Sequence, residues 1–420
     1  MFARTQWENN PFTPGLEIMK RGITVAYSGV HQAYQLALAA EELGRLDHFY
    51  CSLFAGTNKW GGALARLLGS DRLINRRIDG VSPEKARENP WPLLAHRFRA
   101  KLRPATANDW VKANGRFDGW VARQLKRSES AVFVGVETCA SESFALARKR
   151  GMVCVLDCPG VDASVLDGLA LEAARTFGLA TVGFADPPAM RERKRREIEL
   201  ADAILVCSEV QERMFRAQTA TNASLYIVPL WVDSHFWRPA EGERKSGSGP
   251  LRALFVGKIN LRKGVPFLVR AASECEKSVS LTLVGGVDDE LRPFLNNYEG
   301  KINILPPCTK TELRKHYQSH DLLVLPSLGD SFGFVAMEAM ACGAPVVVSE
   351  NCGAPVPDPS WRVPVMDSAA IARRFEYYAS NPQALEQDRQ VARRFALRFT
   401  PERYREKIKE LYLRLLEMSA

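Results

Sequence analysis

The sequence has no long apolar run and few cysteines, and both absences narrow the class of protein. No apolar stretch approaches the about 20 residues that a membrane-spanning helix needs, and residues 1–20 contain no apolar segment of the secretory type. The 9 cysteines are odd in number and form no Cys-x-x-Cys pair. We therefore expect a cytoplasmic protein whose thiols are reduced and mostly buried, without a zinc site.

Two common motifs of nucleotide and metal chemistry are missing as well. The chain has no Gly-x-Gly-x-x-Gly fingerprint for dinucleotides, and Ser28-Gly29-Val30 provides only a single glycine turn after the first apolar run. It also has no Asp-x-Asp, the usual carboxylate pair for a metal-bound diphosphate. We expect no metal site, so the charge of any bound diphosphate would have to be balanced by lysines and a helix dipole.

The composition is that of a folded chain with several domains. Its 420 residues are 46% hydrophobic and 25% charged, a mixture typical of globular proteins and unlike that of disordered or fibrous chains. At roughly 150 residues per domain, this length predicts two or three domains.

Positive charge is concentrated in one region. The formal net charge is +9, and residues 71–130 alone contain 14 Lys/Arg and 7 Asp/Glu. Such an excess is compatible with nucleic acid, with an anionic membrane surface or with a phosphate-bearing substrate.

The same region contains a pattern with two interpretations. Leu94, Phe98 and Leu102 recur at the spacing of one helical face, and basic residues lie between them. Such a helix could lie on an anionic bilayer. The alternative is an ordinary amphipathic helix, with its apolar face in the core and its basic face in solvent.

Short apolar runs alternate with helical stretches along the whole chain. Strands are expected at Ile23–Ser28, Phe49–Phe54, 131–136, 153–156 and 203–207, with a helix over 31–44. The pattern restarts after 239–250, which is rich in Gly, Ser and Pro, with strands over 253–256, 280–284, 322–325 and 346–349.

This alternation predicts an α/β fold with two doubly wound parallel-sheet domains that face each other across a cleft. We expect a polar tail over 1–20, a first domain over 21–238, a linker over 239–250, a second domain over 251–400 and a final helix over 401–420.

The segment 321–345 is the richest in chemical signals. A buried strand ends at Pro326, a polar loop follows, and a helix is expected from about Phe332–Gly333 to Cys342. The free N–H groups at the start of that helix would bind an anion, most naturally phosphate. Glu338 lies inside the otherwise apolar helix, where an unpaired carboxylate would be costly and hydroxyl or N–H donors are needed.

The roles of the two carboxylates in this segment remain open on residue physics alone. Asp330 and Glu338 could contact two points of an extended ligand, or Asp330 could be only a helix cap and Glu338 only part of a structural ion pair. In the loop Gly257–Gly264, which reads GKINLRKG, Lys258 and Lys263 could reach a diphosphate or could simply be solvated.

Four blocks of the sequence resemble glycosyltransferase family 4, the retaining nucleotide-sugar transferases of GT-B fold. These blocks are ADAILVCS with the hinge VPLWVDSHFWRP, then GKINLRKG, then DLLVLPSLGDSFGFVAMEAMACGAPVVVS with its E-x7-E block at Asp330 and Glu338, and the closing FTPERYREKIKELYLRLL. The C-terminal half matches nearly end to end and the N-terminal half only in outline. Lys258 and Asp330 depart from the Arg and Glu that the family usually has.

The resemblance implies a site at the carboxyl ends of the strands. Catalysis would depend on Asp330, Lys263 and Lys258. Donor binding would involve Gly29, Lys258, Lys263, Asp330, Ser331, Phe332, Gly333, Phe334, Val335 and Glu338. Gly285, Pro307 and Cys308 would lie along the nucleobase. The diphosphate sugar is a substrate, and no cofactor is expected.

The acceptor side is less defined. Many relatives have a histidine after the fourth strand of the first domain, whereas this chain has AVFVGVETCASES, so His31, Glu137 and Asp157 are the candidates there.

The implied reaction transfers a sugar with retention from a UDP- or GDP-sugar to a hydroxyl of a glycan or lipid-linked glycan, in polysaccharide or glycoconjugate synthesis. Alternatives are a nucleotide-sugar epimerase or other GT-B enzyme, or a basic binding module with a decayed site. We expect a cytoplasmic enzyme with peripheral contact to an anionic membrane through residues 71–130, and no nucleic-acid partner.

Overall fold

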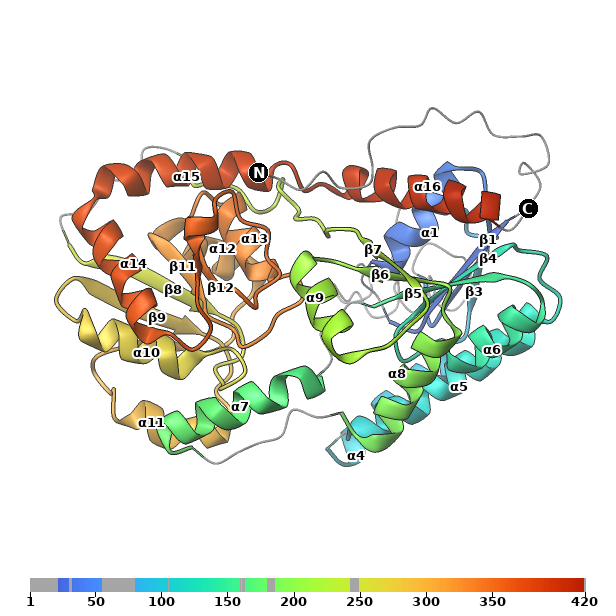
Figure 1. Cartoon of the computed structure of the whole chain (residues 1–420), viewed down its shortest axis with the longest axis horizontal. Coiled ribbons are helices and arrows are strands. Elements are labelled where there is room, and N and C mark those ends of the chain that lie inside the picture. The colour runs from blue at the N-terminus through green and yellow to red at the C-terminus, as the bar shows by residue number, and fades with distance from the viewer. Residues whose placement is uncertain are drawn as a thin grey trace.

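Two parallel β-sheets form the framework of the protein (Figure 1). The computed structural model describes residues 22–29, 32–54, 80–104, 106–158, 160, 163–179, 186–241 and 249–418. Within these ranges one sheet belongs to the N-terminal half of the chain and the other to the C-terminal half, as the restarting pattern predicts.

The first sheet has seven strands in the order β3-β2-β1-β4-β5-β6-β7, all parallel. Its strands are β1 Ile23–Tyr27, β2 Leu46–Cys51, β3 Ala86–Glu88, β4 Val132–Val136, β5 Val153–Asp157, β6 Ala203–Val206 and β7 Ser224–Ile227. The chain leaves β1 in one direction and returns to continue in the other, which makes the sheet doubly wound with a switch point between β1 and β4.

Helices cover both faces of this sheet. Its helices are α1 Ala33–Glu42, α4 Trp91–Leu102, α5 Ala107–Leu125, α6 Ser141–Lys149, α8 Pro188–Leu200 and α9 Glu209–Gln218. Successive strand residues pack on opposite sides: Val134 faces the cluster that includes α1, whereas Phe133 faces the cluster that includes α5, α6 and α8. Burial on both faces explains why these strands are continuous apolar runs.

The second sheet has six parallel strands in the order β10-β9-β8-β11-β12-β13. These strands are β8 Leu251–Val256, β9 Val279–Val284, β10 Asn303–Leu305, β11 Leu322–Leu325, β12 Val346–Ser349 and β13 Arg362–Val363. Its helices are α10 Val265–Glu274, α11 Arg292–Asn296, α12 Lys310–Ser319, α13 Phe334–Ala341, α14 Ser368–Ser380 and α15 Pro382–Ala396, with short 3-10 turns at Asp289–Leu291 and Pro359–Trp361. This sheet is doubly wound as well.

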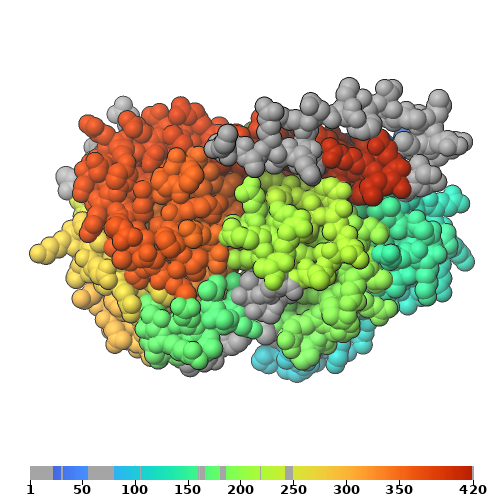
Figure 2. All heavy atoms as spheres, viewed as in Figure 1, coloured from blue at the N-terminus to red at the C-terminus, as the bar shows by residue number. Residues whose placement is uncertain are grey.

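Two helices join the lobes. The final helix, α16 (Pro401–Met418), runs back over the N-terminal lobe, where it packs against α1 (Figures 1 and 2). Helix α7 (Ala163–Phe177) follows β5 of the first sheet but lies beneath the C-terminal lobe (Figure 1). Its Phe177 contacts Phe267 and Phe294 edge to face at ring-centroid distances of 4.8 and 5.3 Å.

The structure corrects three details. Strand β2 begins at Leu46 rather than Phe49 and ends at Cys51, because its pairing with β1 sets its limits. Helix α13 begins at Phe334, one residue after Gly333, whose left-handed backbone (φ 63°) is incompatible with the helix.

The third correction concerns α4. Its buried residues are Pro92, Leu93 and His96, whereas Phe98 and Leu102 are 65% and 72% exposed. The interpretation in which the Leu94, Phe98 and Leu102 face packs into the core is therefore wrong, because the core takes the opposite face of the helix.

The nine cysteines all lie within the described ranges and form no disulfide with one another; eight are buried and Cys308 is half-buried. Most of the expected linker, the tail over 1–20 and residues 71–79 lie outside the described residues.

Candidate functional site

Three loops of the second sheet meet at its carboxyl edge, and glycines allow their close approach. A Cβ at Gly264 (φ +69°) would lie 1.9 Å from the Pro326 carbonyl oxygen at the end of β11. A Cβ at Gly285 would lie 1.8 Å from the Gly257 carbonyl oxygen. The loop Gly257–Gly264, here called the lysine loop, is thus in close backbone contact both with the Gly285-Gly286 turn and with the start of the loop before α13.

Asp330 links two of these loops. Its carboxylate accepts hydrogen bonds from the Gly333 N–H at 2.8 Å and the Phe332 N–H at 3.3 Å, and it pairs with the Lys263 ammonium at 2.5 Å. Burial would raise the pKa of Asp330, but the charge of Lys263 and these hydrogen bonds outweigh it, so the pKa lies below its ordinary value. Asp330 is therefore a carboxylate anion that holds the start of α13 and the lysine loop together.

The predicted donor-binding residues at the start of α13 fall into two groups, those whose N–H already bonds Asp330 and those in the first helical turn. The Phe332 and Gly333 N–H groups, predicted to meet a diphosphate, are occupied by Asp330 in this structure. The first intrahelical bond of α13 is donated by Ala336 to the Gly333 carbonyl. The N–H groups of Phe334 and Val335 lie in the first turn, where helix geometry leaves amides without an intrahelical acceptor.

Glu338 has the hydrogen-bond donor that its burial requires. The Tyr317 hydroxyl, on α12, donates to its Oε2 at 3.0 Å. Desolvation raises the pKa of Glu338 to about 7, although Tyr317 and Lys310 act in the opposite direction. The Tyr317 ring packs against Trp237 at 5.4 Å, so the hydroxyl is held firmly. The sequence gives no sign of Tyr317 as a partner, because no motif connects it with Glu338.

The two predicted lysines occupy different surroundings. Lys258 is 63% exposed and pairs with Asp288 at 2.6 Å, whereas Lys263 is 26% exposed and pairs with Asp330, which is 16% exposed. Each lysine therefore already has a carboxylate partner. An incoming diphosphate would share or displace those partners.

The predicted nucleobase-side residues also come together. The Gly285 N–H donates to the Leu305 carbonyl at 3.0 Å, and the Gly286 backbone lies beside Pro307. Cys308 follows in the same loop and is half-buried. The structure thus places Gly285, Pro307 and Cys308 in neighbouring loops at the carboxyl ends of β9 and β10.

The first sheet contributes contacts that the sequence does not predict. At the carboxyl end of β6, the Cys207 thiol and the Ser208 hydroxyl donate to the Ser331 carbonyl at 3.2 and 2.7 Å. Cys207 also experiences the charges of both Asp157 and Asp330. The carboxyl edges of the two sheets therefore face each other.

Two of the three predicted acceptor-side residues, Asp157 and Glu137, lie at this edge of the first sheet, the first buried and the second half-buried. Asp157 is 4% exposed, and burial raises its pKa to about 7, partly offset by a hydrogen bond from Gln32. Glu137 contacts Lys194 at 3.5 Å and accepts a hydrogen bond from the Cys158 thiol at 3.3 Å. The Gly29 backbone lies against the Tyr27 ring, and His31 lies outside the described residues.

A polar network beside these residues carries no sequence signal. Glu197 accepts hydrogen bonds from the N–H groups of Thr138 and Ala140 at 2.6 and 2.8 Å, and Asn114 donates to the Thr138 hydroxyl at 2.8 Å. Burial raises the pKa of Glu197 to about 8. Thr138 has a φ of 72°, which is uncommon for a residue other than glycine and marks this loop as conformationally constrained.

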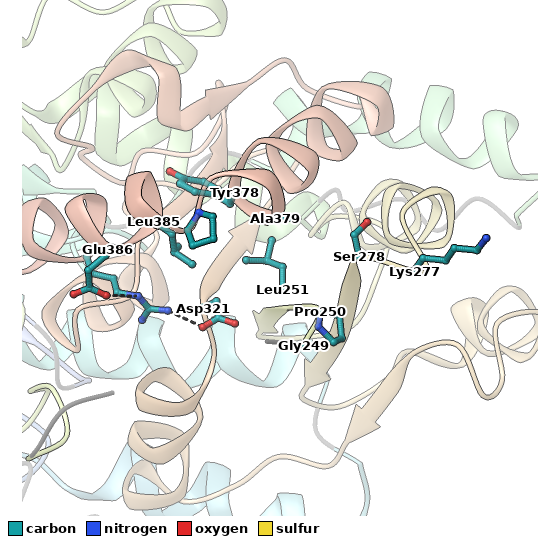
Figure 3. Close-up of a pocket in the computed structure, with 12 residues that line it drawn as sticks. Gly249, Pro250, Leu251, Lys277, Ser278, Asp321, Tyr378, Ala379, Leu385 and Glu386 are labelled. Atoms are coloured by element: carbon teal, nitrogen blue, oxygen red, sulfur yellow. Dashed lines mark hydrogen bonds and ion pairs between the residues drawn. The ribbon is translucent and has the colours of Figure 1, made fainter. Parts of the chain in front are cut away.

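A separate hollow of about 340 Å³ lies at the other end of the second sheet (Figure 3). Leu251 at the start of β8, Ser278 before β9 and Asp321 before β11 line it, so it opens at the amino ends of the strands. Arg252 and Arg389 pair with Asp321 at 2.8 and 2.6 Å. The hollow is far from the α13 start along the strands and does not belong to the candidate site.

Comparison with known proteins gives a family match for one third of the chain. Residues 250–381 match the model of the family described as Glycosyl transferases group 1. The D-inositol 3-phosphate glycosyltransferases of Mycobacterium leprae and Mycobacterium bovis are 29% and 28% identical to this chain over 208 residues, 44% of its length. These matches span only 47% and 42% of the relatives' own lengths.

Solved structures match nearly the whole fold. A sucrose-phosphate synthase from Thermosynechococcus elongatus superposes with a TM-score of 0.66 at 16% identity, covering 95% of this chain and 100% of that chain. Anabaena HepE in complex with UDP gives 0.60 at 15% identity, covering 93% and 99%. The chain thus has the GT-B arrangement of two Rossmann-like domains.

No helix in the described ranges is long and apolar enough to cross a membrane. No group of three or more His, Cys, Asp or Glu side chains among the same residues is placed to hold a metal ion.

Proposed function

We propose that this chain is a retaining glycosyltransferase of family 4 that moves a hexose from a nucleotide-diphosphate sugar to a hydroxyl acceptor. The observation that carries this proposal is the cluster around α13 at the carboxyl edge of the second sheet, where Lys263 and Asp330 lie at the helix N-terminus and Glu338 follows within the helix. Both the family match and the GT-B fold support it.

The site offers separate contacts for each part of such a donor. The first-turn amides of Phe334 and Val335 and the positive end of the α13 dipole would meet the diphosphate. Lys263, with the more mobile Lys258, would balance its remaining charge. The Oε1 atom of Glu338 would accept from the ribose hydroxyls, while Tyr317 fixes Oε2. Asp330 and the Ser331 backbone would contact the transferred sugar.

Retention would follow a front-face route, without an enzyme nucleophile. The lysines and the helix N-terminus would stabilise the departing diphosphate electrostatically, and the first domain would hold the acceptor hydroxyl on the same face of the sugar. The transfer needs no metal in this scheme, so activity should persist in EDTA.

A uridine nucleotide is the first donor to test. HepE was solved with UDP and with UDP-glucose, and a further structural neighbour from Burkholderia xenovorans is a UDP-forming trehalose-phosphate synthase. The acceptor would be a glycan or a lipid-linked glycan, in polysaccharide or glycoconjugate synthesis. We place the enzyme in the cytoplasm, in peripheral contact with the inner face of the membrane.

A donor-consumption assay tests the proposal. Wild-type protein is incubated with labelled UDP-glucose and related nucleotide sugars, with and without acceptor extracts, alongside Glu338→Ala and Lys263→Ala. We expect acceptor-dependent release of nucleotide that both substitutions reduce by about 100-fold or more. Conversion of the sugar nucleotide without acceptor would indicate an epimerase instead. Consumption unchanged by both substitutions would refute the assigned site.

A further inference from the structure

Helix α4 has two apolar faces, and only one of them packs on the protein. Its inner face holds Pro92, Leu93 and His96, and the His96 ring stacks on Trp110 of α5 at 3.9 Å. Its outer face holds Phe98 and Leu102, which are 65% and 72% exposed. An ordinary amphipathic helix has only the first of these faces.

The outer residues form one stripe. Leu94, Phe98 and Leu102 are four residues apart, so each lies only about 40° around the helix from the one before. The stripe runs on the side of the helix opposite to His96. Trp110 adds a nearby aromatic ring that is 46% exposed. These large apolar side chains lie next to one another along successive turns, whereas the apolar residues on an ordinary protein surface are scattered singly.

Positive charge flanks this stripe. Residues 89–108 contain four basic residues and no acidic one. Arg99 lies about 100° from Phe98 on one side, and Lys101 lies about 60° from it on the other. Both are exposed. Arg103 is committed to a bidentate pair with Asp109 at 2.9 and 3.0 Å, which anchors the end of α4 to α5.

The neighbouring helix extends the positive charge. Lys112, Arg116 and Arg123 of α5 line a shallow hollow of about 460 Å³, which the Glu142 side chain of α6 also enters beside Gly119. Helix α4 itself lies at the periphery of the N-terminal lobe beside α5 (Figure 1). The surface therefore combines an apolar ridge with cations on both sides of it.

We propose that the outer face of α4 docks on an anionic lipid bilayer. Phe98 and Leu102 would enter the boundary between headgroups and acyl chains, while Arg99 and Lys101 would meet the lipid phosphates. The charge complementarity selects this occupant. A nucleic acid would pair with the cations but would leave the apolar ridge in water, and an uncharged apolar partner would leave the cations unsatisfied.

Vesicle flotation tests this proposal. The full-length chain is mixed with vesicles of phosphatidylcholine alone or with about one third phosphatidylglycerol, at low and high salt. We expect binding to the anionic vesicles that weakens with salt, and a loss of about tenfold or more in partitioning for the double variant Phe98→Ser/Leu102→Ser. The matched control is Leu397→Ser, an exposed leucine beside arginines on the other lobe.

The alternatives give distinct results. Equal vesicle binding by the wild type and the double variant, or no vesicle binding by the wild type, would overturn the proposal. Capture of labelled RNA or self-association that the double variant abolishes, without vesicle binding, would also overturn it. Thermal unfolding of each variant checks the fold, which exposed positions should leave intact. Because no donor is present, this result is independent of the proposed glycosyl transfer.

Discussion

Glu338 combines a burial cost with a proposed binding role, and the pH dependence of unfolding should reveal the burial cost. Burial raises its pKa to about 7, above the 4.5 expected in the unfolded chain. Between these values the folded state binds more protons than the unfolded state, so this residue's contribution to stability is present at low pH and falls as the pH rises towards 7.

Replacing the carboxyl by an amide should remove this dependence. For Glu338→Gln we expect the stability relative to wild type to improve by roughly 2 kcal/mol between pH 5 and pH 7.5. Urea unfolding at the two pH values measures it, with the exposed Glu350→Gln as a control. Parallel pH profiles for the wild type and Glu338→Gln would show that the carboxyl titrates normally.

The two lysines of the GKINLRKG loop should differ when each is replaced by alanine. Lys263→Ala leaves the largely enclosed Asp330 carboxylate, which is 16% exposed, without its cation, so we expect a stability loss of about 3 kcal/mol. Lys258 is largely exposed, so Lys258→Ala should cost less than about 0.5 kcal/mol. Urea titrations measure the free energy of unfolding of the two variants. Equal losses would mean that the ion pair with Asp330 does not stabilise the protein more than the exposed pair does.

For Glu338 the sequence predicted that a hydrogen-bond donor is required, but it did not predict which residue provides it. A carboxylate inside the apolar run VAMEAMA has to find a donor, and that much is visible in the residues. The donor, Tyr317, lies on a different helix, so local spacing could not identify it. In the same way, the polar side chains that face Lys258 and Lys263 follow from how the loops fold together.

Among the elements, the lysine loop depends on close backbone contact. Gly264 has a positive φ, and a Cβ there would overlap the Pro326 carbonyl, whereas Gly300 has a positive φ and a Cβ there would meet no atom within 4 Å. We expect Gly264→Ala to lose about 3 kcal/mol or more and Gly300→Ala only about 1 kcal/mol. Denaturant unfolding measures the stability of both variants. Similar losses of stability would show that the positive φ alone, and not the clash with the Pro326 carbonyl, destabilises Gly264→Ala.

Whole elements differ in how far the sequence defines them. The strand, loop and helix over 321–345 were predicted to within a residue or two, because Pro326, Gly333 and Gly343 mark the breaks. For α4, periodicity located an apolar face but could not show which side meets the core. The face formed by Pro92, Leu93 and His96 is the one that packs on the protein, because α4 lies against α5 on that side.

For the whole molecule, the path of α16 makes the N-terminal lobe depend on the end of the chain. Leu411 is fully buried in the cluster that includes α1, whereas Leu413 on the same helix is 36% exposed. We expect Leu411→Ala to destabilise the protein by about 2–4 kcal/mol and Leu413→Ala by less than about 1 kcal/mol. Calorimetry checks the pair, and equal losses would contradict this packing.

The proposed function depends on nucleotide-sugar binding at the α13 start, which isothermal titration measures. Wild-type protein, Glu338→Ala and the exposed control Glu350→Ala are each titrated with UDP-glucose and then with related nucleotide sugars. We expect wild type and Glu350→Ala to bind one of them alike and Glu338→Ala to bind it about 100-fold more weakly. Equal binding by all three proteins, or no binding of any nucleotide sugar to the wild type, would contradict the claim.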